Sequence, residues 1–159
     1  MYSDALKKSM YAFKYNNRRE YAGYYANEIF NNQGHILKSF GAEALIPVPL
    51  HKKKLRKRGY NQAEVLAKAL SDYMKIPVDA NVIKRVKNTK PQKELNDSDR
   101  VKNLESAFKM NINSVKYNKV ILVDDIYTTG STIDECAALL KANGTDKVYF
   151  VTACVGRGF

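Results

Sequence analysis

One segment near the C-terminus carries residues whose types and order suit the binding of a phosphorylated sugar. An apolar run at 120–123 ends in two adjacent acids, Asp124 and Asp125, and a hydroxyl-rich turn that leads into a helical pattern follows: Thr128, Thr129, Gly130, Ser131 and Thr132. Backbone N–H groups at a helix N-terminus bind phosphate, the glycine allows close approach, and the hydroxyls add donors. Two carboxylates at a strand end accept hydrogen bonds from vicinal sugar hydroxyls or reach a hydrated Mg²⁺.

A purely structural interpretation of this segment is that the two acids end a strand while Ser131 or Thr132 caps a helix. We favour a ligand site, because adjacent acids and four hydroxyls around a glycine exceed what one cap needs. The GxxxxGK[ST] and GxGxxG patterns are absent from the sequence. Nucleoside triphosphatase and dinucleotide-binding functions therefore lose their main support.

Positive charge is the second chemical signal. The chain has 27 Lys and Arg against 16 Asp and Glu, a formal charge of +11, which favours polyanionic partners such as nucleic acid, nucleotides or phosphate esters. Six cations fall within residues 52–58, after an apolar run and before a helical pattern, a position that predicts a loop. The alternative is a solvated loop or a non-specific nucleic-acid patch. Asn61 and Gln62 follow at the start of the next helical pattern. Both could donate to a phosphate, and the alternative for Asn61 is a role as the N-cap of that helix.

The surrounding elements alternate between helix and strand. Helical spacing covers residues 4–14, 18–40, 61–75, 97–104 and 133–142, and strand patterns cover 44–50, 82–86, 107–110, 119–124 and 147–155, with a turn at 89–96. This alternation predicts an α/β domain with a mainly parallel sheet, which binds ligands beyond the carboxyl ends of its strands.

The bulk composition predicts a single domain over residues 1–159, since 45% hydrophobic residues suffice for one core and exclude disorder. No stretch approaches the roughly 20 apolar residues that cross a bilayer, and no signal peptide is visible. We therefore expect a cytoplasmic protein without membrane insertion. The two cysteines, Cys136 and Cys154, lie in apolar segments and are expected to be buried, reduced and inert, which excludes a disulfide scaffold or a zinc ribbon.

The segment VILVDDIYTTGST resembles the phosphoribosyl pyrophosphate (PRPP) binding signature of type I phosphoribosyltransferases. Three further stretches resemble the ComF/GntX family of competence-associated proteins, in the family's order: FKYNNRREYA, IPVPLHKKKLRKRGYNQAEVLAKAL and TKPQKELNDSDRVKNLESAF. The resemblance implies a type I phosphoribosyltransferase-like α/β fold, with a mainly parallel sheet flanked by helices and a small hood, and a role in competence and DNA uptake. Many members begin with a four-cysteine zinc-binding segment, which this sequence does not contain.

The resemblance also implies roles for individual residues. Asp124 and Asp125 contact the ribose hydroxyls of PRPP, directly or through Mg²⁺, and residues 128–132 hold its 5′-phosphate. The pyrophosphate lies at the loop after the first strand and beneath a mobile basic flap, at Val48, Pro49, Leu50, His51, Arg56 and Arg58. Cations and Mg²⁺ suit that place, because the leaving pyrophosphate gathers negative charge.

The acceptor is left open by the sequence. Gln92, Arg100 and Asn103 resemble polar positions of the family's hood, where an acceptor enters. The position of Thr128 is an aspartate base in some purine-salvage members, and a threonine cannot serve as that base. The general base, whether turnover occurs and the oligomeric state stay open too.

Two functions compete. The first is an enzyme that transfers phosphoribose from PRPP with Mg²⁺ to an unidentified acceptor. The second is a non-catalytic module of DNA uptake that binds single-stranded DNA or docks on a DNA-uptake helicase. Five tyrosines favour the second, because aromatic rings among cations stack bases, although such a stripe more often faces the core: Tyr11, Tyr15, Tyr21, Tyr24 and Tyr25.

Overall fold

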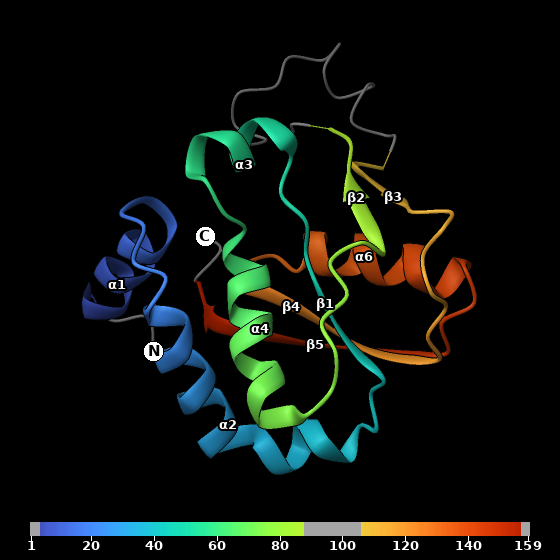
Figure 1. Ribbon diagram of the computed structural model, residues 1–159, viewed down its shortest axis with the longest axis horizontal. Helices are drawn as coiled ribbons and strands as arrows, with labels where there is room; N and C mark the ends of the chain where they lie inside the picture. Colours follow the sequence, from blue (N-terminus) through green and yellow to red (C-terminus); the bar gives the residue numbers. More distant parts are fainter. Residues whose placement is uncertain (1–3, 88–105, 157–159) are drawn as a thin grey trace.

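A computed structural model describes residues 4–87 and 106–156 of the chain (Figure 1). Its centre is a parallel sheet in the order β1-β4-β5, formed by β1 (Ala44–Pro47), β4 (Lys119–Tyr127) and β5 (Lys147–Val155). The register places Ile46 beside Leu122, and Leu122 beside Phe150. The predicted parallel sheet is confirmed, but β4 continues beyond Asp124 to Tyr127.

Three of the predicted helices cover one face of the sheet: α1 (Asp4–Tyr15), α2 (Tyr21–Ser39) and α4 (Gln62–Met74). Their apolar stripes meet the sheet in one core, where Phe13, Leu66 and Leu70 pack with Ile121 and Val123 of β4. No helix within the two described ranges is long and apolar enough to cross a membrane.

The other face is covered by α6 (Ser131–Ala142), which connects β4 to β5, and by an antiparallel pair, β2 (Ile83–Arg85) and β3 (Phe108–Met110). Ile46 and Leu122 point into this second core. Cys136 and Cys154 are buried free thiols, as expected. The hood residues Gln92, Arg100 and Asn103, and the helix and turn predicted at 89–104, lie outside the described residues.

The basic segment is a short helix, α3 (Lys52–Arg58), and the predicted loop is wrong. The ring of His51 caps its start, since the Lys53 N–H donates to His51 Nδ1 at 3.2 Å. At its end Gly59 is left-handed, with φ 85°, and its N–H donates to Leu55 O at 2.7 Å. Lysine, arginine and leucine are good helix formers, and cations in the last turn favour the helix dipole. No residue of α3 is buried, so the helix leaves no apolar periodicity in the sequence.

Candidate functional site

The hydroxyl-rich turn after β4 forms the N-terminus of α6. Gly130 is the N-cap with φ 83°, and the first helical hydrogen bond runs from the Asp134 N–H to Gly130 O at 2.8 Å. Ser131 and Thr132 are therefore the first residues of the helix rather than its cap. A Cβ on Gly130 would lie 2.6 Å from the hydroxyl oxygen of Tyr127, so another residue here would have to displace the Tyr127 ring and would also strain the left-handed backbone. The first N–H groups of a helix have no hydrogen-bond partner within the helix, so they are available to bind an anion.

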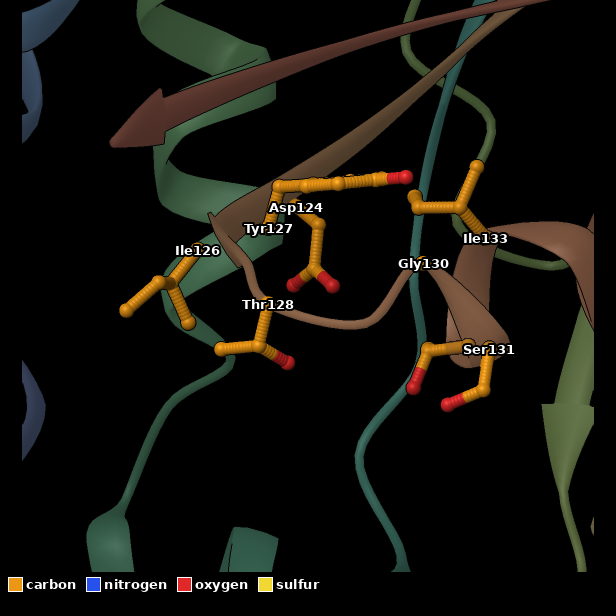
Figure 2. Close-up of a pocket in the computed structure, with 8 residues that line it drawn as sticks. Asp124, Ile126, Tyr127, Thr128, Gly130, Ser131 and Ile133 are labelled. Carbon is orange, nitrogen blue, oxygen red and sulfur yellow. The ribbon is translucent and has the colours of Figure 1, made fainter. Parts of the chain in front are cut away.

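A small pocket lies on the concave side of this turn, with a cavity volume of about 20 Å³. Figure 2 shows the carboxylate of Asp124 directed into the space enclosed by Thr128 and Ser131. Five of the seven predicted phosphate and sugar residues line it: Asp124, Thr128, Gly130, Ser131 and Thr132. Ile126, Tyr127 and Ile133 complete the lining. Thr129 is held beside the pocket, with its hydroxyl 3.1 Å from that of Ser131.

The two adjacent carboxylates lie on opposite faces of the sheet. Successive side chains of a strand alternate between faces, and β4 is still a strand at this point. Asp124 follows Leu122 toward the face covered by α6, whereas Asp125 follows Val123 toward α1 and α4. The structure therefore places Asp124, and not Asp125, at the pocket of the α6 turn.

Asp125 is the centre of a buried polar network. Its Oδ2 atom lies 2.8 Å from Nζ of Lys14 and accepts a hydrogen bond from Nε2 of Gln62 at 3.0 Å. Arg58 of α3 donates in turn to Oε1 of Gln62. The sequence interpretation missed Lys14, although a signal existed. Lys14 stands four residues after Met10, a position that faces the core, and a cation there requires an anionic partner.

Asn61 and Gln62 both have structural partners in place of a phosphate. The Asn61 side chain accepts from the Ala63 N–H at 3.0 Å, which makes it the N-cap of α4, and donates to Val48 O at 3.0 Å. Gln62 bridges Asp125 and Arg58. The capping interpretation of Asn61 is therefore confirmed.

The predicted pyrophosphate loop begins at the same sheet edge as Asp124. The Val48 N–H donates to Val123 O at 2.8 Å, so the loop leaves the sheet beside the end of β4. Pro49 and Leu50 are half-buried, and His51 caps α3. Of the two predicted flap cations, Arg56 is exposed on α3, and Arg58 lies over the ring of Tyr15, 5.2 Å from its centroid.

Burial and a like charge act on the carboxyl group of Asp124. Burial is the larger cause and the charge of Asp125 the second, and together they raise the pKa of Asp124 to about 7. The Asp125 N–H donates to Asp124 Oδ1 at 2.8 Å, which opposes the rise in this pKa. A cation beside Asp124 would favour its ionised form.

The cysteines do not take part in chemistry at this site. Burial raises the pKa of the Cys136 thiol to about 12 and that of Cys154 to about 11. Thiols of this kind are protonated at neutral pH and unreactive, as the sequence predicted.

The five tyrosines of the first two helices divide between core and surface. Tyr25 is buried and Tyr21 is half-buried, as a core-facing stripe requires. Tyr11, Tyr15 and Tyr24 are about 60% exposed. The core interpretation therefore accounts for only part of this set.

Comparison with known proteins extends the similarity beyond the turn. Residues 60–158 match the family of the phosphoribosyl transferase domain. The chain is 44% identical over 108 residues to competence protein F of Haemophilus influenzae, an alignment that covers 67% of this chain and 47% of that protein. It is 30% identical over 156 residues to DNA utilization protein YhgH of Shigella flexneri, covering 96% of this chain and 68% of that protein. The chain thus spans about half to two thirds of the length of these relatives.

Among solved structures, a purine phosphoribosyltransferase from Pyrococcus horikoshii is similar with a TM-score of 0.43 and 17% identity, covering 80% of this chain and 70% of that one. That similarity is too distant to carry an argument about the site. The domain match spans more than half of the chain, and the alignment with YhgH runs over nearly all of it. The chain therefore belongs to the ComF/GntX family of proteins with a type I phosphoribosyltransferase fold.

Proposed function

We propose that this protein binds PRPP together with Mg²⁺ and transfers its phosphoribosyl group to an acceptor. The bond between sugar C1 and the pyrophosphate oxygen breaks, C1 bonds to the nucleophilic atom of the acceptor, and the acceptor releases a proton. One observation carries the proposal: a carboxylate, a helix N-terminus and several hydroxyl groups converge on one small pocket. Membership of a phosphoribosyltransferase-domain family supports it.

The parts of PRPP are assigned by chemistry. The turn from Thr128 to Thr132 takes the 5′-phosphate, since it offers hydroxyl donors and the N-terminus of α6. Asp124 takes the ribose hydroxyls, because its carboxylate opens into the same pocket. We assign no sugar contact to Asp125, whose Oδ2 atom is held by Lys14 and Gln62.

The residues at the pocket fit Mg²⁺. This ion is bound by one or two carboxylates together with substrate phosphates and water, and Asp124 offers such oxygens beside the turn. When bound, Mg²⁺ would neutralise the charge of the leaving pyrophosphate. The elevated pKa of Asp124 is consistent with a carboxyl that ionises fully once a cation is beside it.

Calorimetric titration tests this function. PRPP, ribose 5-phosphate and pyrophosphate are titrated into the wild type and Asp124→Asn, each with Mg²⁺ and with a chelator. Wild-type protein is expected to bind PRPP in a Mg²⁺-dependent manner, and Asp124→Asn to bind at least about tenfold more weakly, as loss of a charged hydrogen-bond acceptor requires. Asp146→Asn, an exposed carboxylate in the loop before β5, serves as the control. Absence of binding for all three ligands would remove the PRPP site.

The biological role that we propose is competence and DNA uptake, in the cytoplasm. Two similar proteins carry the names competence protein F and DNA utilization protein, and these names support the role. Docking on a DNA-uptake helicase belongs to the same proposal. The link is tested by deleting the gene and measuring transformation with linear DNA, where an unchanged frequency would argue against it.

A second candidate function is the binding of single-stranded DNA. It is favoured by the three exposed tyrosines at positions 11, 15 and 24 on a chain of charge +11. Binding of this kind neutralises phosphates and weakens steeply with salt. Fluorescence anisotropy of a labelled oligonucleotide at increasing salt tests it, and an affinity that does not change with salt would contradict it.

A further inference from the structure

We propose that a pocket between α1 and α3 is a second ligand site, which binds a nucleotide by stacking its base on Tyr15 and holding its phosphate among Lys54, Lys57 and Arg58. The pocket shares no lining residue with the one at the α6 turn. Its cavity volume is about 340 Å³, against about 20 Å³ at the turn. Small-molecule sites in proteins commonly fall at about 300–1,000 Å³. In Figure 1, α3 lies above the upper end of α4 and α1 lies to the left of α4.

Among the described residues, the lining of this pocket contains cations and no acid. Four of its six residues are cations, and Lys14 alone among these four has a carboxylate partner, Asp125. Lys54, Lys57 and Arg58 have no ion-pair partner within residues 4–87 and 106–156. Burial, and then the charges of Arg85, Arg58 and Lys14, lower the pKa of Lys54. Cations crowded in this way repel one another, and a bound phosphate relieves the repulsion while it gains charge-assisted hydrogen bonds.

An aromatic platform stands beside these cations. The ring of Tyr15 is 60% exposed. The ring of Tyr11 is tilted against it, with 4.8 Å between the centroids, and the guanidinium of Arg58 lies 5.2 Å from the centroid of the Tyr15 ring, which places a phosphate-binding cation directly beside the stacking ring. Tyrosine faces stack nucleobases with little dependence on sequence. Asn17 also lines the pocket. Its side-chain Oδ1 atom accepts a hydrogen bond from Nε of Arg19 at 3.0 Å. The amide NH₂ of Asn17 is therefore left as a donor for the edge of a base. Phosphate-binding cations next to a stacking ring and an amide are the groups that a nucleotide requires.

Two of the cations that line the pocket, Lys14 and Arg58, are held in place without a ligand. Arg58 is fixed by its hydrogen bond to Gln62, and Lys14 by its ion pair with Asp125. Both Gln62 and Asp125 are buried. A preformed site loses little side-chain entropy on binding, so its contacts contribute more fully to affinity.

The test uses the whole chain and four probes: AMP, dTMP, inorganic phosphate as the probe without a base, and a twelve-residue oligo-dT as the strand. Affinities are measured by calorimetry at low salt for Tyr15→Leu and for Lys54→Gln/Lys57→Gln. The controls are Tyr73→Leu, an exposed tyrosine of α4 outside the pocket, and Lys119→Gln/Lys147→Gln, an exposed lysine pair at the opposite end of the strands.

We expect AMP and dTMP to bind more tightly than phosphate and the double lysine variant to weaken them about tenfold or more. Tyr15→Leu is expected to remove the advantage over phosphate, because stacking is lost. Both controls are expected to match the wild type. If oligo-dT binds and Tyr15→Leu and Lys54→Gln/Lys57→Gln lose this binding, the site is also supported. The bound nucleotide would then be part of a single strand.

Three outcomes would overturn the proposal: no binding of any nucleotide probe, nucleotide binding that both pocket variants leave intact, or nucleotide binding that ribose 5-phosphate displaces and Asp124→Asn abolishes. The last result would mean that nucleotides enter the PRPP pocket instead. Because Asp124 lies outside the α1–α3 pocket, loss of PRPP binding in Asp124→Asn leaves this proposal standing, and the two proposals fail independently.

Discussion

Two neighbouring carboxylates near the end of β4, on opposite faces of the sheet, have opposite surroundings. On one face, Asp125 is buried with a lysine and a glutamine already in contact. On the other, Asp124 opens into a pocket and its pKa is raised by burial and by the charge of Asp125. A carboxylate with a built-in partner stabilises the fold, whereas one that faces a ligand site is unfavourable as an ion until the ligand comes. This comparison predicts opposite effects on stability for the same chemical change at adjacent positions.

The largest expected effect is that of Asp125→Asn. The substitution keeps the shape of the side chain but leaves Lys14, whose side chain is only 20% exposed, without an anion. Breaking a buried pair from one side costs about 3–5 kcal/mol, and we expect about 3 kcal/mol here because Lys14 retains some contact with water. Urea unfolding measures the loss.

Two further variants make that measurement specific. Glu64→Gln breaks the exposed pair of Glu64 and Lys68 and should cost at most about 0.5 kcal/mol. Lys14→Met in the Asp125→Asn background should recover part of the loss, since it removes the orphaned cation. Wild-type stability in Asp125→Asn would show that the two faces do not differ as described.

Gly130→Ala tests the turn on the other face. The new Cβ would meet the hydroxyl of Tyr127 at 2.6 Å, and the backbone holds φ at 83°. The ring of Tyr127 stacks on Phe150 with 5.3 Å between the centroids, so a shift of Tyr127 away from the new Cβ would disturb this contact. We expect a loss of about 2 kcal/mol in the free energy of unfolding together with weaker ribose 5-phosphate binding.

The matched control for that variant is Gly144→Ala, which has φ 100° and nothing within 4 Å of its Cβ. It carries only the backbone strain, about 1 kcal/mol, and should leave ligand binding unchanged. Equal losses for the two variants would mean that the close approach of the Tyr127 hydroxyl contributes nothing.

The sequence was sufficient for the elements whose side chains alternate between core and solvent. Residues 4–14 and 61–75 carry clear helical periodicity, and the observed α1 and α4 differ from these predictions by at most one residue at each end. The strand predicted at 147–155 has the bounds of β5. The turn was also predictable, because hydroxyl groups and a glycine after two acids have few other uses. The helix α3 was not predictable by this route, since it buries none of its residues.

The placement of Asp124 and Asp125 on opposite faces of the sheet could have been predicted from the sequence, but the prediction missed it. A period of two sends adjacent strand residues to opposite faces, and the prediction placed the end of the strand at Asp124, where that rule stops applying. Because β4 runs on to Tyr127, the alternation continues through both acids. The partner of Asp125 depends on how α1 docks on the sheet, a tertiary contact that no local pattern specifies.

The smallest effect has the opposite sign and depends on pH. The folded protein raises the pKa of Asp124 from 3.8 to about 7, so ionisation of this group disfavours the folded state. Protonated Asp124 therefore contributes to the free energy of unfolding. This contribution is fully present below pH 4 and is lost as the pH rises through 7. Asp124→Asn removes this loss. In chelator, it should therefore match the wild type near pH 4 and be more stable than the wild type at pH 8. Thermal unfolding across this pH range measures the difference, with the exposed Asp146→Asn as a variant expected to stay parallel to the wild type. If Asp124→Asn were destabilising at pH 8, Asp124 would have a structural partner of its own, and the contrast between the two faces would disappear.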